Sequence, residues 1–339
     1  MRKALLSPEG ILLLLIAAVS VFLSVATPSF ASIQNLFDLL NNQSVNIIFA
    51  VGLVVVLISG GIDISFSVAA SVVQYVVVSL LLNFDGGNWA IAIVLTCGTG
   101  IALGLLNALF IHRFRIVSII VTIGTFNLFF GLLMYVSRGR SIYAIPDWLY
   151  ARITILSVEL ERGSANLYLP VLVMAVMVLA TGLILARTGF GRQIYGFGSS
   201  PEAAKRSGVN VALIQAFAYG WLGLCAGIAG LMQAHIVREV VPNALYGREL
   251  DILAAVVLGG AVLGGGRGTV TGAVLGVMLL ALIQNGLNLL GISPFVFKVV
   301  VGVVILSAIT VRNLDRLLPK LNHATAKGGD ATARGQADA

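Results

Sequence analysis

Charged residues are scarce in this sequence. Only 10% of its 339 residues are Asp, Glu, Lys or Arg, and 58% are hydrophobic, whereas an ordinary globular protein carries about 25% charged residues. So few polar side chains do not cover a water-facing surface, which argues against a soluble fold and indicates a lipid bilayer as the solvent. The net charge of +7 does not indicate nucleic-acid binding, because Lys and Arg punctuate apolar runs instead of gathering on one polar face.

Residues that carry catalysis or bind metals are scarce too. Cys97 and Cys225 both lie inside apolar runs, where we expect buried small side chains, and the three histidines show no metal-ligand spacing. The sequence contains no H-E-x-x-H, no G-x-S-x-G and no G-x-x-x-x-G-K-[ST] motif. We therefore expect no metal site, no nucleotide site and no enzymatic activity in this chain.

Long apolar runs are what the sequence has in abundance. A spanning helix needs about 20 apolar residues, and we count ten candidate runs, of which the second and eighth are short and end in glycines. They are residues 11–27, 45–59, 67–83, 89–111, 116–137, 168–186, 211–235, 252–265, 269–290 and 295–311. The runs predict an all-α, polytopic membrane protein with about ten transmembrane helices. An alternative for the first run is a cleaved signal peptide, since Arg2 and Lys3 precede it and Ser29-Phe30-Ala31 follows.

The basic residues predict the orientation of the chain. With the N-terminus in the cytoplasm, fourteen Lys and Arg fall in inner segments and six in outer ones, so the positive-inside rule places both termini in the cytoplasm. We expect a transmembrane domain over residues 1–320, with a cytoplasmic loop at 187–210 and an outer loop at 138–167. The polar residues 321–339 are expected to form a disordered cytoplasmic tail.

The chain also shows a faint internal likeness. Residues 105–124 resemble residues 283–302, and ten spans that divide as five plus five would give two halves of opposite orientation, as in the inverted repeats of transporters. Glycines four apart, as in Gly100/Gly104 and Gly223/Gly227, predict close helix packing.

The inner loop contains a polar stretch, GFGSSPEAAKRSGVN, at residues 196–210. Either Ser199 or Ser200 would cap a short helix there, Pro201 suits its first turn, and Gly208 would end it. A helix of about seven residues is too short to be stable alone in water, so we expect another surface to hold it. Its residues are Ser200, Pro201, Glu202, Ala203, Ala204, Lys205 and Arg206.

Polar residues inside the spans are mostly uncharged amides. Buried amides need hydrogen-bond partners across helices or in a solute cavity, and amides without charges suit a neutral polyhydroxylated solute better than an ion. The candidates for a translocation pathway are Asn46, Gln74, Asn107, Asn127, Gln284, Asn285 and Asn288; Gln233 is an eighth amide. Gly60, Gly61, Asp63 and Ser65 are candidates for a gate or for the cap of the next span.

Three segments together resemble the permeases of bacterial ABC sugar importers of the ribose, xylose and autoinducer-2 type. They are GGIDIS at residues 60–65, FGRQIYGFGSSPEAAKRSGVN at 190–210, and ELDILAAVVLGGAVLGGGRGTVTG at 249–272. The likeness extends from about residue 45 to 311. One departure is Phe66-Ser67-Val68, where the family has Val-Gly-Ser.

The resemblance implies the partners of the chain. Two such permease subunits, identical or paralogous, form the pathway in the bacterial inner membrane, and the helix at Ser200–Arg206 would seat in a cytoplasmic ATPase that holds ATP and Mg²⁺. An extracytoplasmic binding protein would deliver the sugar or polyol, and Arg138, Arg140, Arg238 and Arg248 are candidates for docking it. The alternatives are an ABC permease for amino acids or another small metabolite, a secondary carrier working alone, and a membrane enzyme.

Overall fold

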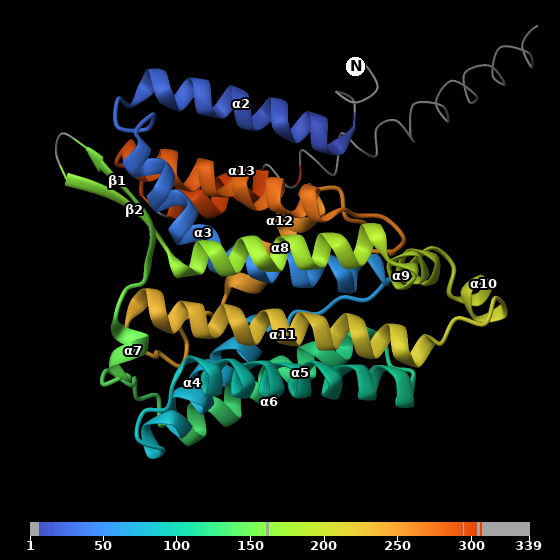
Figure 1. Ribbon diagram of the computed structural model, residues 1–339. Coiled ribbons are helices and arrows are strands. Elements are labelled where there is room, and N and C mark those ends of the chain that lie inside the picture. The colour runs from blue at the N-terminus through green and yellow to red at the C-terminus, as the bar shows by residue number, and fades with distance from the viewer. Residues whose placement is uncertain (1–6, 161–162, 294, 304–305, 307–339) are drawn as a thin grey trace, which may run out of the picture. The chain divides into compact units, whose positions relative to one another are not determined.

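The computed structural model describes residues 7–160, 163–293, 295–303 and 306. The chain divides into two compact units, residues 1–292 and 293–339. Among the described residues, eight helices of the first unit are long and apolar enough to cross a bilayer. They are α2 (Pro8–Ala26), α3 (Ile33–Ile58), α4 (Phe66–Asn83), α5 (Trp89–Phe114), α6 (Ser118–Ser137), α8 (Leu169–Arg187), α11 (Val211–Val237) and α13 (Val270–Leu289). They run side by side (Figure 1).

Three of the ten predicted spans do not coincide with these helices: the second is longer, the eighth is shorter, and the tenth is only partly described. The second, predicted at 45–59, begins twelve residues earlier because its polar first turns find partners: Asn35 bonds Asn285 and Asn41 bonds the backbone of Asn166. The eighth is only α12 (Arg248–Leu258), 11 residues or about 16 Å long, which is half of a bilayer core. Of the tenth, residues 295–303 are helical; its last part and the tail 321–339 lie outside the described residues.

The predicted outer loop contains strands, so the expectation of an all-α fold was incomplete. After α7 (Asp147–Tyr150), β1 (Thr154–Leu160) pairs antiparallel with β2 (Gly163–Tyr168), with Leu160 opposite Gly163 and a bulge near Leu156. The sequence signal was the β-branched and apolar residues of T-I-L-S-V-E-L, which a span count does not weigh.

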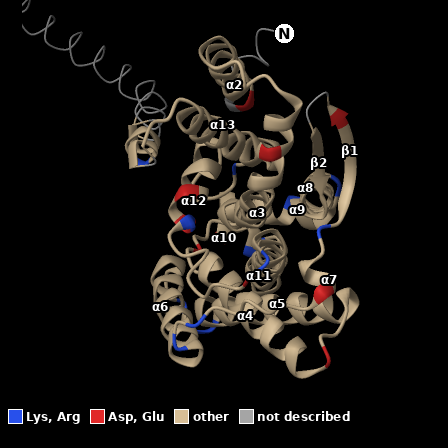
Figure 2. Ribbon diagram, turned by 90° about the vertical axis from the view of Figure 1, so that its left-hand side faces the viewer, with Lys and Arg blue, Asp and Glu red and all other residues tan. Residues whose placement is uncertain are grey.

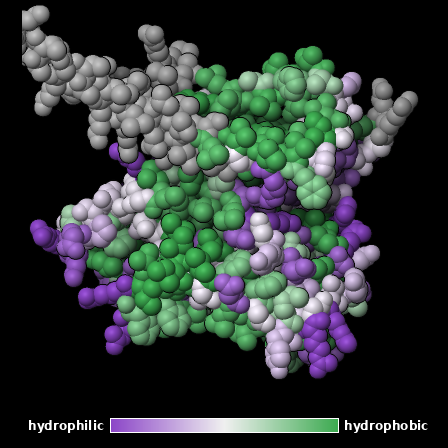
Figure 3. All heavy atoms as spheres, turned by 180° about the vertical axis from the view of Figure 1, so that it is seen from behind, coloured by the Kyte–Doolittle hydropathy of each residue, from purple (hydrophilic) through white to green (hydrophobic). Residues whose placement is uncertain are grey.

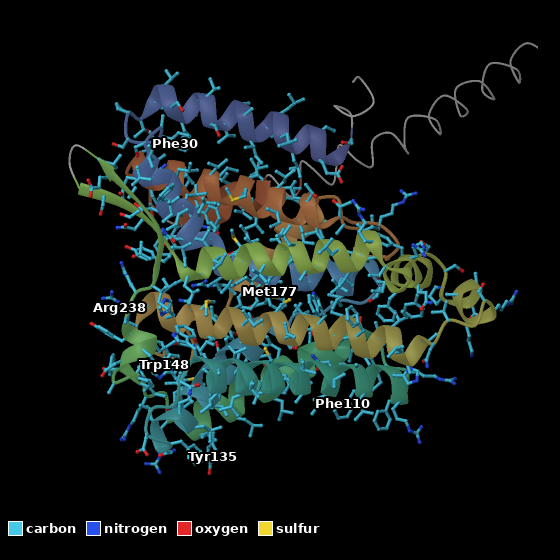
Figure 4. All side chains as sticks on the ribbon, viewed as in Figure 1. Phe30, Phe110, Tyr135, Trp148, Met177 and Arg238 are labelled. Carbon is cyan, nitrogen blue, oxygen red and sulfur yellow. The ribbon has the colours of Figure 1, made fainter. Side chains whose placement is uncertain are left out.

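The connections gather at two ends of the helices. At the hairpin end, the Trp148 indole donates to the Gly86 carbonyl and Ile142 bridges to Val240. At the α10 end lie α9 (Gly189–Ser199) and α10 (Pro201–Arg206) (Figure 1). From α2 to α11 the long helices alternate in direction, whereas α11 and α13 both run from the α10 end to the hairpin end, because the chain returns between them through the short α12. Figure 4 labels Trp148 and Arg238, which lie together at the hairpin end.

Helix α3 is the centre of the core. Every residue from Ile47 to Ile58 is buried, because α3 packs against α11, α13, α8 and α12. Gly52 allows the approach of α11, since a Cβ there would lie 2.8 Å from the Cβ of Cys225. Between α5 and α11 the approach is closer still: a Cβ at Gly104 would collide with the carbonyl of Tyr219. The predicted role of the glycines in helix packing is confirmed for this pair.

The packing repeats itself in opposite directions. The internal sequence likeness aligns residue 105 with residue 283. The same offset aligns Ile33, the first residue of α3, with Val211, the first residue of α11. Helix α11 packs against α4 and α5, and α3 packs correspondingly against α12 and α13. Since α3 and α11 run in opposite directions, the two groups of three helices are related as an inverted repeat.

Candidate functional site

The polar stretch of the inner loop forms the short helix that the sequence predicts. In α10, Ser200 is the cap, and its hydroxyl accepts a hydrogen bond from the Ala203 amide at 3.4 Å. Glu202 lies in the first turn and Lys205 in the last, which places each charge at the favourable end of the helix. Gly208 takes a positive φ of 81° and ends the helix. The ambiguity between Ser199 and Ser200 is resolved in favour of Ser200.

Helix α10 lies open on the surface. All of its residues except Ala204 are exposed, and it projects past the ends of the long helices (Figure 1). Six helical residues gain too little from their own hydrogen bonds to stay folded alone. The surface is therefore suited to a partner that covers it.

Helix α9 connects α10 to the core. Gly198 lies so close to the end of α3 that a Cβ there would collide with the Ile58 carbonyl. The same carbonyl accepts from the Gly266 amide at 2.8 Å, and the Tyr195 hydroxyl donates to the Gly268 carbonyl at 2.8 Å. Displacement of α9 therefore acts directly on the end of α3 and on the loop between α12 and α13.

The connection between α3 and α4 contains the predicted gate residues. Gly60 has a positive φ of 86°, and a Cβ at Gly61 would collide with the Tyr219 hydroxyl. Asp63 is buried, with 2% of its surface exposed, although a position at the membrane rim was expected. One of its oxygens accepts from both the amide and the hydroxyl of Ser65, each at 2.7 Å.

Asp63 also holds this connection to α5. Its second oxygen accepts from Asn107 Nδ2 at 3.1 Å, and the same nitrogen lies 2.8 Å from the Ser65 hydroxyl. Asp63 thus bonds the cap residue of α4 and also interacts with the backbone of Phe66, the first residue of the helix, whereas Ser65 itself makes no side-chain cap bond. The arrangement fits a structural clasp between α4 and α5.

The seven candidate pathway amides do not gather in one place. Asn107 belongs to the Asp63 clasp, Asn285 bonds Asn35, and Asn127 donates to the Ile123 carbonyl of its own helix. Gln284 and Asn288 are exposed on α13. The structure brings only Asn46 and Gln74 to a common neighbour, the connection between α11 and α12: Asn46 accepts from Arg248, and Gln74 donates to the Val241 carbonyl.

The four candidate docking arginines separate into two groups. Arg138 and Arg238 end α6 and α11 at the hairpin end with left-handed backbones, Arg140 is exposed beside them, and Arg238 lies 4.9 Å over the Tyr150 ring. Arg248 lies elsewhere: it begins α12 and bonds Asn46, which is at the middle of α3. In the sequence Arg248 falls in an outer segment, because the apolar run resumes only at Ile252.

Two contacts in the same region have no counterpart in the sequence analysis. The Ser67 hydroxyl donates to Glu249 at 2.6 Å, which joins the start of α4 to the start of α12. Tyr246 packs its ring against Phe126 and Phe130, with centroids 5.3 and 4.7 Å apart. The available signal was the charged sequence R-E-L-D directly before an apolar run, a place where charges are costly unless they have partners. Figure 2, which looks along the helices, shows acidic and basic positions beside α12.

Comparison with known proteins agrees with these features. Residues 35–309 match the family model described as "Branched-chain amino acid transport system / permease component". The chain is 33% identical to the ribose import permease RbsC of Escherichia coli K12 over 326 residues, covering 92% of this chain and 95% of that one. No solved structure matches.

Two further relatives have other solutes in their names. The galactose/methyl galactoside import permease MglC of Escherichia coli K12 is 30% identical over 90% of this chain and 93% of its own length. The autoinducer 2 import system permease LsrC of Photorhabdus luminescens is 32% identical, with 87% of each chain covered. The resemblance that the three sequence segments indicated is confirmed.

Proposed function

The chain belongs to the family of transport-system permease components, and from that premise we propose that it forms the membrane pathway of an ATP-driven importer for a small sugar or sugar-like polyol. It works in the bacterial inner membrane beside a second permease subunit, a copy of itself or a paralogue. ATP and Mg²⁺ belong to a cytoplasmic ATPase, and a binding protein delivers the solute on the other side.

The observation that carries the proposal is the exposed helix α10 and its seat on the core. A helix this short requires support, and the ATPase surface would supply it. Closure of the ATPase would push α10, and α9 would pass the displacement through Gly198 to the end of α3 and to Gly266. ATP binding then favours one of two conformations of the spans through contacts that differ between them.

The solute class follows from the relatives and from the charges. The names of three relatives contain ribose, galactose and autoinducer 2, whereas the family description names amino acids. A solute carboxylate would need a cation of its own. Arg248 lies at mid-span, but Glu249 follows it directly and Asp251, one turn later, attracts its guanidinium. This balance of charges favours a neutral solute.

Reconstitution tests the proposal. The chain, its ATPase and its binding protein are placed in proteoliposomes, and uptake of D-ribose, D-galactose and L-leucine is measured with ATP, with ADP and with ion gradients alone. We expect uptake of a sugar that requires ATP and the binding protein. Uptake of L-leucine alone would favour the amino-acid alternative, and uptake by the chain without ATPase would favour a secondary carrier.

A further inference from the structure

The connection between α11 and α12, residues 238–247, reaches from the hairpin end to the middle of the membrane. It starts at the hairpin end, where Val240 bridges to Ile142. It finishes where Arg248 donates from Nη1 to Asn46 Oδ1 at 3.3 Å, at the middle of the 26-residue helix α3. Tyr246 meets Phe126 and Phe130, which lie in the middle of α6. We call residues 238–247 the re-entrant segment.

Backbone without helical hydrogen bonds is tolerated at this depth only where protein surrounds it or where it borders a water-filled cavity. One side of the re-entrant segment is open. Asn243 and Gly247 are exposed, 51% of the Tyr246 side chain is accessible, and a Cβ on Gly247 would meet nothing within 4 Å. Lipid tails offer no hydrogen-bond partner to an exposed polar side chain such as Asn243. On the rear face, Figure 3 shows hydrophilic surface between two hydrophobic areas.

The other side of the re-entrant segment is held in place by hydrogen bonds. Glu249 is buried, with 6% of its surface exposed, and accepts from the Ser67 hydroxyl at 2.6 Å and from the Gly247 amide at 3.0 Å. Gln74 holds the Val241 carbonyl. These contacts fix the first turn of α12 against α4, so Tyr246 and Arg248 have defined positions.

The open side presents the groups that a sugar needs. Tyr246 offers a flat, half-exposed ring held by tilted contacts with Phe126 and Phe130, and the apolar C–H face of a sugar packs on such a ring. The Arg248 guanidinium carries five N–H donors. The Asn46 amide donates to Gln43 Oε1 at 2.7 Å and accepts from Arg248, which leaves it one further N–H and one further lone pair. Asp251 attracts the guanidinium of Arg248 and offsets its charge, while Glu249 is engaged by Ser67 and the Gly247 amide.

We propose that Tyr246, Arg248 and Asn46 form a contact site for a neutral sugar or polyol halfway through the membrane, on the water-facing side of the re-entrant segment. The solute class rests on the proposed function; the position of the site rests on the structure alone. In this site Arg248 donates hydrogen bonds to hydroxyl groups of the solute. Arg138, Arg140 and Arg238 at the hairpin end remain the candidates for docking the binding protein.

Accessibility to water gives the first test, and it needs no knowledge of the solute. Cys97 and Cys225 are replaced by alanine, and single cysteines are introduced as Tyr246→Cys and, as the control, Leu179→Cys. Leu179 is 65% exposed at the middle of α8. In the complex in liposomes, we expect a charged, membrane-impermeant thiol reagent to modify position 246 about tenfold faster or more, because only that position borders water. Equal rates at both positions would overturn the site.

Protection and transport give the second test. D-Ribose or D-galactose, whichever the parent complex imports, should slow the modification of a cysteine introduced as Asn243→Cys, an exposed position of the same segment that leaves the Tyr246 ring in place. Tyr246→Ala should lower uptake by about tenfold, equivalent to about 1.4 kcal/mol, with ATPase-complex assembly intact. Tyr135→Ala removes another tyrosine, 83% exposed at the end of α6, and should transport normally.

The outcomes separate this site from the proposed function. Modification without protection by the imported sugar, together with normal uptake by Tyr246→Ala, would overturn the site while sugar import stands. Import of L-leucine, with protection by L-leucine alone, would overturn both the proposed function and the assignment of a neutral solute. Protection by the imported sugar with impaired uptake supports the site.

Discussion

Gly198 is a single residue on which contact between three parts of the chain depends. A Cβ at this position would collide with the Ile58 carbonyl at the end of α3 and lie 2.6 Å from the Gly266 amide. Those two groups bond each other at 2.8 Å, so neither moves without breaking a backbone hydrogen bond. A side chain here therefore forces α9 away from the core, at a cost typical of overpacking, about 1–3 kcal/mol.

We predict that Gly198→Ala lowers the thermal unfolding temperature of the detergent-solubilised chain and reduces ATP-driven uptake. Gly196→Ala is the matched control in the same helix, because a Cβ at Gly196 meets nothing within 4 Å. That control should unfold and transport like the parent. Equal effects of the two substitutions would show that α9 does not press on α3 as described.

At the scale of an element, α10 differs from every long helix because it is polar and exposed. Glu202 and Lys205 complement the helix dipole, and both side chains are exposed. If α10 seats in the ATPase, the signs of its charges matter for the fit, since like charges placed across an interface oppose binding.

We predict that the double variant Glu202→Lys with Lys205→Glu lowers the rate of ATP-driven uptake about tenfold or more, while the chain still inserts in the membrane. Uptake in proteoliposomes and copurification of the ATPase measure the effect. The conservative pair Glu202→Asp with Lys205→Arg keeps both charges in place and should retain uptake. Normal uptake in the reversed variant would count against docking through α10.

The packing of α5 on α11 is a second property of elements. Gly104 lies against the backbone of Tyr219 and Gly220, whereas Gly98, on the same helix, has open space around its Cβ position. We predict that Gly104→Ala destabilises the folded chain by about 1–3 kcal/mol and that Gly98→Ala leaves it unchanged within about 0.5 kcal/mol. Thermal unfolding in detergent distinguishes them; similar values for both would contradict the close approach.

For the whole molecule, the arrangement of connections at two ends makes the orientation testable. On the cysteine-free background, Ser207→Cys lies at the α10 end and Ser164→Cys lies in the hairpin; both positions are exposed. The positive-inside rule places the α10 end in the cytoplasm. An impermeant thiol reagent should therefore label position 164 in intact cells and position 207 only in inverted vesicles. The reverse pattern would remove α10 from the reach of a cytoplasmic ATPase.

Hydropathy predicted the existence of the spans but not all of their lengths. Apolar runs locate a helix because apolar side chains are stable in the bilayer and every backbone group forms its hydrogen bond within the same helix. Helix α3 extends past its apolar run, since Asn35 and Asn41 find partners on α13 and on β2. The hairpin was missed for a related reason: β1 and β2 satisfy each other, and neither is apolar enough to count as a span.

The sequence by itself determined the solvent, the existence of the long helices and the short polar helix with a serine cap. Each of these follows from local composition or from residues within a few positions of one another, such as Ser200 and Ala203. Only the tertiary structure decided that Asp63 is buried against Asn107, that Arg248 bonds the middle of α3 and that Tyr246 packs on the middle of α6. Those partners lie dozens to hundreds of residues apart in the chain, and no local pattern encodes which distant polar group will be close enough to satisfy a buried charge.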